Sequence, residues 1–262
     1  MSTLNLALRD SNTMLRRNLL HMRRYPSLTL MLVGIPVILL LLFVYVFGGT
    51  LGAGLGPSGD RADYANYVTP GILLITVASA AQGTAISVAM DMAEGIIARF
   101  RTMAIFRPSV LTGHVVGSVL QTMFSLAAVT GVALLVGFRP TASAVEWLAA
   151  IGVLTMITFA VTWLSVALGL VTKSVETASN LPMPLVLLPF LGSGFVPTDS
   201  MPTPVRLFAD YQPFTPVMET LRGLLLGTGI GSNGILAVAW CAVITVACFL
   251  WAKALYNRGR TA

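Results

Sequence analysis

Residues 27–48 read SLTLMLVGIPVILLLLFVYVFG, and this run contains no Asp, Glu, Lys or Arg. A helix needs about 20 apolar residues to cross the roughly 30 Å hydrocarbon core of a bilayer. Backbone groups inside lipid must be hydrogen-bonded within the segment itself, which favours a helix. The run therefore predicts a membrane-spanning helix, with Gly34 and Pro36 as its two irregular points.

Five further stretches of the chain lack charged side chains and are long enough to cross a bilayer. Their length and their weak two-residue alternation argue against a β-barrel. The sequence therefore predicts an all-α membrane protein with six transmembrane helices. No internal repeat or linker divides it, so residues 1–262 form one predicted domain. The predicted spans are about 27–48, 68–90, 110–138, 147–172, 177–197 and 233–252.

The composition excludes an ordinary soluble protein. Of 262 residues, 56% are hydrophobic and only 10% are charged, whereas soluble domains carry about 25% charged residues. A water-exposed surface cannot be built from so few charges. A bilayer is therefore the expected solvent, and residues 48–67 are expected to be a Gly-rich external loop.

The basic residues predict the orientation of the chain. Six spans put both termini on one side of the membrane, and twelve of the 16 Lys and Arg residues fall on that side. The remaining four fall on the other side, so the positive-inside rule predicts a multi-pass protein of the cell membrane with cytoplasmic termini. Because the charge is spread over several loops, nucleic acid is not an expected partner.

Residues 4–24, before the first span, have an amphipathic pattern. Apolar Met14, Leu15, Leu19 and Met22 share one side of a helical wheel, and four Arg residues lie on another. This pattern predicts an interfacial helix that contacts anionic lipid. The alternative is a basic anchor with no fixed helix.

The chain lacks the motifs of common catalytic sites. It contains no G-x-x-x-x-G-K-[ST] phosphate loop, no G-x-S-x-G and no H-E-x-x-H. Its two His residues cannot supply a typical zinc site, and the sequence places no catalytic partner beside His114. The chain is therefore not predicted to be an enzyme or to bind a cofactor itself.

The most highly charged link between two predicted spans is residues 91–108, DMAEGIIARFRTMAIFRP. Spacings of four and three residues place Ile96, Phe100 and Met103 on one ridge of a helix. Such an apolar ridge with charged flanks is typical of a short helix that docks onto a partner. It also fits a helix that dips into the lipid interface, and the residues alone leave both interpretations open.

Two segments resemble the ABC-2 type permeases, and more closely the daunorubicin-resistance permease group of actinobacterial exporters. The first is DMAEGIIARFRTM at residues 91–103, followed by PSVLTG at 108–113. The second is YQPFTPVMETLRG at residues 211–223. Six spans, cytoplasmic termini and a basic N-terminal segment are also similar to this family, so the resemblance covers essentially the whole chain.

The resemblance implies a membrane subunit of an exporter. In that family two six-span subunits, identical or related, bind two copies of a cytoplasmic ATPase, which holds ATP and Mg. The resemblance assigns Glu94, Gly95, Arg99, Phe100 and Arg101 to the ATPase contact. Our reading of the residues adds Ile96 and Met103 to the ridge and lets Pro108 end the unit. It also places Glu94 and Arg101, seven residues apart, on a common face.

The region after the fourth span is irregular. Three Pro and two Gly residues within 182–194 predict a kinked or interrupted fifth span. Residues 198–232 are predicted to form short helices over the outer membrane face. By resemblance, an external gate includes Pro213, Pro216, Glu219 and Arg222. A local ion pair is the simpler explanation of the last two, which are three residues apart.

The expected cargo is an amphipathic, drug-like or lipid molecule, because the spans contain no charged groups to bind a charged polymer. Candidate residues of its path are Gln82, Met183 and Phe190, although hydrogen bonding between helices explains Gln82 more simply. Two rival functions remain, an ion-gradient-driven transporter and a membrane assembly or scaffold protein. The lack of a carboxylate in mid-membrane counts against the first rival.

Overall fold

The computed structural model describes residues 26–55, 60–94, 108–172 and 174–258, and every regular element in these ranges is a helix. The predicted interfacial helix at 4–24 lies outside the described residues. Within the described ranges, five helical stretches are long and apolar enough to cross a membrane. They are Leu30–Ala53, Arg61–Ala93, Thr112–Val136, Ala144–Val171 and Asn233–Tyr256. Five of the six predicted spans are thus present as long helices.

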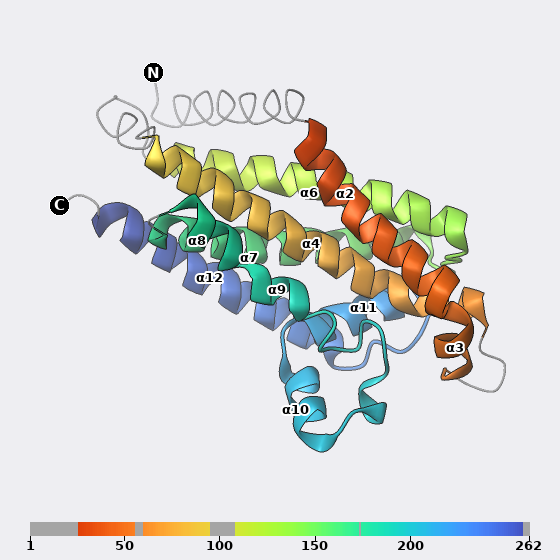
Figure 1. Ribbon diagram of the computed structural model, residues 1–262. Helices are drawn as coiled ribbons and strands as arrows, with labels where there is room; N and C mark the ends of the chain where they lie inside the picture. Colours follow the sequence, from red (N-terminus) through yellow and green to blue (C-terminus); the bar gives the residue numbers. More distant parts are fainter. Residues whose placement is uncertain (1–25, 56–59, 95–107, 173, 259–262) are drawn as a thin grey trace.

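The long helices lie side by side in one bundle (Figure 1). The first stretch is continuous through α2 (Pro26–Leu41), the π-helical η1 (Leu42–Phe47) and α3 (Gly48–Ala53). The others are α4 (Arg61–Ala93), α6 (Pro108–Val136), α7 (Ala144–Val171) and α12 (Asn233–Arg258). The end of α4, the start of α6 and the end of α12 share one end of the bundle, whereas α3 and α10 lie at the other (Figure 1).

The prediction of a loop at residues 48–67 is wrong for most of these residues, because they form α3 and the first turns of α4. Asp60 begins α4 as a capping box. Its Oδ1 accepts hydrogen bonds from the backbone N–H groups of Ala62 and Asp63, at 2.7 and 2.9 Å, and Asp63 accepts one from Asp60 N. This cap satisfies backbone donors that would otherwise be free at a helix start.

The predicted fifth span, 177–197, is not one continuous helix. Its residues form α8 (Val175–Asn180), α9 (Met183–Leu187) and a series of turns, so the expected interruption is confirmed. Pro182, Pro184 and Pro189 lack the N–H that a continuous helix requires. Both short helices pack against α4.

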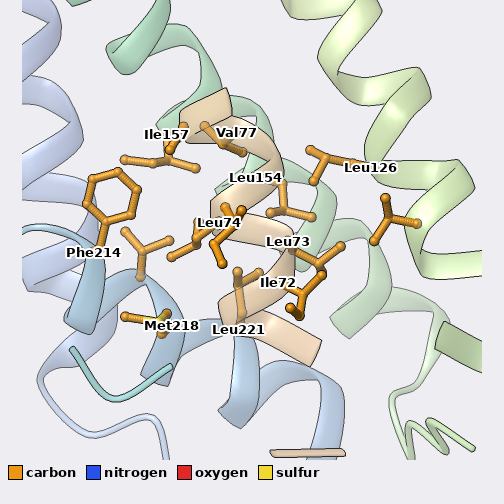
Figure 2. Close-up of a cluster of buried hydrophobic side chains, with 14 of the residues drawn as sticks. Ile72, Leu73, Leu74, Val77, Leu126, Leu154, Ile157, Phe214, Met218 and Leu221 are labelled. Atoms are coloured by element: carbon orange, nitrogen blue, oxygen red, sulfur yellow. The ribbon is translucent and has the colours of Figure 1, made fainter. Parts of the chain in front are cut away.

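Residues 198–232 form η2 (Thr198–Ser200), α10 (Thr203–Tyr211) and α11 (Phe214–Leu226), as the prediction of short helices requires. Their packing differs from the prediction, because α11 enters the core and does not merely cover it. Figure 2 shows its Phe214, Met218 and Leu221 beside Ile72 and Leu74 of α4. All five side chains are buried, and close van der Waals packing between them helps to hold these helices together.

The backbone of residues 175–197, which we call the interrupted segment, lies in close contact with α4. A Cβ added to Gly71 of α4 would lie 2.7 Å from the carbonyl oxygen of Gly194 and 2.9 Å from its Cα. A side chain at residue 71 would therefore push the segment away from α4. Gly83, on the same helix, meets open space.

We expect Gly71→Leu to destabilise the protein by about 1–3 kcal/mol through overpacking, and Gly83→Leu to change stability by less than about 0.5 kcal/mol. Thermal melting of both purified variants in detergent measures this. Equal melting temperatures for the two variants would contradict the close contact.

Candidate functional site

The predicted ATPase-contacting segment is described only at its two ends. Glu94 follows the last turn of α4, donates its backbone N–H to Met90 O at 2.9 Å, and has an exposed side chain. Pro108 is the first residue of α6. Gly95, Ile96, Arg99, Phe100, Arg101 and Met103 lie outside the described residues, so their roles stay predictions.

A buried polar pair lies beside this segment. Asp91, in the last turn of α4, and His114, in the second turn of α6, are each only 6% exposed. His114 Nε2–H donates to Asp91 Oδ2 at 2.9 Å. The sequence placed no partner beside His114, because residues 23 positions apart meet only when two helices adopt a particular rotation.

The candidate path residues lie in three different environments. Gln82 is half-buried on α4 and donates its Nε2–H to Ser179 O of α8 at 2.6 Å, which confirms the hydrogen bond between helices. The side chain of Met183 is 56% exposed. Phe190 stacks on Phe195 with ring centroids 4.5 Å apart. A shared lining role for the three stays a prediction.

Arg222 is the most highly connected of the predicted gate residues. It is 7% exposed, and its Nη1 contacts Glu219 Oε1, so the predicted local ion pair is present. Its Nη2 donates to Ser193 O at 2.8 Å and Tyr67 O at 3.2 Å. The guanidinium carbon also lies 4.0 Å from the centroid of the Tyr67 ring. Arg222 thereby links α11 to α4 and to the interrupted segment.

The two Pro residues of the predicted gate shape the start of α11. Pro213 precedes the first residue of the helix, and Pro216 is buried in its first turn. A Pro near a helix start removes no intrahelical hydrogen bond, because the first N–H groups of a helix have no partner within it.

Gln212 is a functional candidate that the sequence did not single out. Its Nε2 donates to Leu188 O at 2.9 Å and to Thr215 Oγ1 at 3.2 Å. A Cβ on Gly192 would lie 2.3 Å from this nitrogen, so Gly192 leaves room for the amide. The only signal in the sequence was the position of Gln212 within the second motif, 211–223.

Polar side chains from other parts of the chain hold the interrupted segment, residues 175–197, and one of them is Tyr64 of α4, whose hydroxyl donates to Phe195 O at 3.3 Å. Gln82, Gln212 and Arg222 each donate to one of its carbonyl oxygens, on Ser179, Leu188 and Ser193 respectively. Carbonyls freed by a helix break inside a membrane protein need such donors, because lipid supplies none. We call Gln82, Gln212 and Arg222 the carbonyl clasp.

A hollow of about 510 Å³ lies beside Arg222, at the end of the bundle opposite the Asp91–His114 pair. It is lined by residues from the start of α4, from the link between α6 and α7, from the end of α11 and from neighbouring turns. Its polar lining comes from Asp63, Asn66, Tyr67, Arg139, Thr141, Arg222 and Thr228.

Comparison with known proteins identifies the family of this chain. The sequence pattern of the family described as ABC-2 type transporter matches residues 10–226. The daunorubicin resistance ABC transporter permease protein of Streptomyces coeruleorubidus is 30% identical over 218 residues, which cover 82% of this chain and 75% of that protein. A probable doxorubicin resistance ABC transporter permease protein of Mycobacterium tuberculosis is 23% identical over 226 residues, covering 86% and 81%. This chain belongs to the ABC-2 type transporter family.

Proposed function

We propose that this chain is the membrane permease subunit of an ATP-binding-cassette exporter that moves amphipathic, drug-like or lipid molecules out of the cell. The family match over residues 10–226, which contain both motifs, carries the proposal. Two copies of a separate ATPase bind ATP and Mg, and a second permease protomer, identical or related, completes the transporter. The N-terminal segment contacts anionic lipid.

Residues 175–197 serve as the sixth crossing in broken form. α8 lies near the end of the bundle that holds the end of α12, and α10 lies at the opposite end (Figure 1). The contacts of α8 and α9 with α4, together with the carbonyl clasp, support this path across the bundle. Six crossings then return α12 to the side where α2 begins, which the positive-inside rule assigns to the cytoplasm.

The ATPase acts on residues 94–108, and the cargo leaves the transporter beside α11. Segment 94–108 joins the two adjacent helices α4 and α6, so an ATPase bound to it acts on both. At the other end Pro213, Pro216, Glu219 and Arg222 act as the external gate. The support for this gate is the position of Arg222, which ties α11 to α4 and to the interrupted segment.

Reconstitution tests the proposal directly. The chain is co-expressed with a phosphate-loop ATPase, purified, and placed in proteoliposomes in which doxorubicin is the transported probe. We expect stoichiometric copurification and doxorubicin uptake that requires ATP and persists when proton and sodium gradients are dissipated. Gradient-driven uptake without the ATPase would instead indicate a secondary transporter, and a complete lack of flux would favour the scaffold role.

A further inference from the structure

The Asp91–His114 hydrogen bond links the residues on either side of the segment proposed to bind the ATPase. Asp91 precedes that segment on α4, and His114 follows it on α6. The bond joins them at 2.9 Å between Nε2 and Oδ2. It is therefore a cross-link between the two helices that enter and leave residues 95–107.

Buried apolar residues flank both partners of this bond along the sequence. Val88 of α4 and Val115 of α6 are buried in a cluster with Trp163, Val166 and other residues of α7 and α12. Apolar contacts are non-directional and tolerate sliding or rotation of one helix on another. A buried hydrogen bond to a carboxylate weakens steeply with distance and angle, and cannot be replaced by water there. The Asp91–His114 bond therefore sets the register of α6 against α4.

We infer that Asp91 and His114 are positioning residues for energy coupling, which hold the end of α4 and the start of α6 together as one unit. Movement of residues 95–107 then displaces both helices. Without the bond, the two helix ends separate and the movement is not passed on to the rest of the bundle. This inference rests on the proposed function, because it requires an ATPase bound to residues 95–107.

Doxorubicin proteoliposomes that contain the ATPase test the inference through transport per ATP hydrolysed. For Asp91→Ala and for His114→Ala we expect this ratio to fall about tenfold, while ATPase stoichiometry stays normal and hydrolysis stays within about twofold of the unaltered complex. Asp91→Asn keeps an oxygen acceptor for the imidazole N–H and should retain most of the coupling. The double exchange Asp91→His with His114→Asp should restore at least half of the ratio.

Ser125→Ala is the matched control. Ser125 is buried on α6, like His114, but its hydroxyl donates to Gln121 O of the same helix. Its loss removes a buried polar group without cutting a link between helices, so the ratio should stay unchanged. The inference is overturned if the two alanine variants keep the normal ratio, or if the double exchange is no better than either single variant.

A distance measurement on the permease alone separates this inference from the proposed function. Spin labels are placed at Met90 and Val116, which are exposed on α4 and α6, with Cys241 and Cys248 replaced by Ala. We expect a narrow distance distribution in the parent protein and a broad one in Asp91→Ala; an unchanged distribution overturns the inference even where transport is lost. Failure of the ATPase to copurify with the unaltered chain would overturn the proposed function and the coupling role together.

Discussion

Arg222→Met is expected to lower the free energy of unfolding by about 3–5 kcal/mol, because it removes a buried guanidinium that donates to two carbonyl oxygens and also pairs with the partly exposed Glu219. The variant leaves Glu219 without its cationic partner and the carbonyl oxygens of Ser193 and Tyr67 without these donors. An unsatisfied buried acceptor keeps its desolvation cost, whereas a Met side chain recovers only part of the packing. Loss of Arg222 should also release the interrupted segment from α11.

Arg139→Met provides the matched control. Arg139 lines the same hollow and carries the same charge, but it is exposed and its Nη1 donates to the nearby carbonyl oxygens of Leu134 and Phe138. Water can replace those bonds, so a change below about 0.5 kcal/mol is expected. Arg222→Lys keeps the charge but loses the planar fork that reaches several acceptors at once, and should fall between the two.

Thermal melting of the purified variants in detergent compares them. For a chain of this length a loss of 3–5 kcal/mol corresponds to a decrease in Tm of roughly 10 °C. Wild-type melting of Arg222→Met would show that the clasp contributes little to holding α11. The melting temperature of Arg222→Lys then shows whether the charge of Arg222 or the shape of its guanidinium group stabilises the protein.

The long helices were predictable because their signal is local. A charge-free run of sufficient length predicts a span whatever it packs against, and all five long helices lie where such runs were found. The interruption at 177–197 was predictable for the same reason, since Pro182 and Pro189 break a helix by their own covalent structure. The start of α4 was missed, although Asp60 and Asp63 carry the spacing of a capping box.

The contacts of the site were not predictable, because they depend on how helices are rotated against each other. Nothing in the sequence brings Asp91 to His114 or aims Gln212 at Leu188 O. The sequence of α11 does indicate that this helix is buried. Apolar residues at 214, 217, 218, 221 and 225 follow the spacing of one helix face, which is typical of a helix packed into a core.

Arg101→Glu is expected to separate ATP hydrolysis from transport. The family resemblance assigns Arg101 to the ATPase contact, and reversing its charge replaces an attraction with a repulsion at an interface where like charges cost several kcal/mol. Each 1.4 kcal/mol is a factor of ten in an equilibrium constant. We therefore expect at least a tenfold decrease in doxorubicin moved per ATP, with normal membrane insertion.

Arg206→Glu tests whether any charge reversal has this effect. Arg206 lies on α10, at the opposite end of the bundle, and pairs with Asp199 and Asp210 on an exposed surface where ion pairs contribute little. Its complex should keep the normal ratio of transport to hydrolysis. If the Arg101→Glu complex pumps as well as the Arg206→Glu complex, segment 94–108 is not where the ATPase acts. The apolar ridge of Ile96, Phe100 and Met103 would then be better explained by contact with lipid, because such a ridge suits a membrane interface as well as a protein groove.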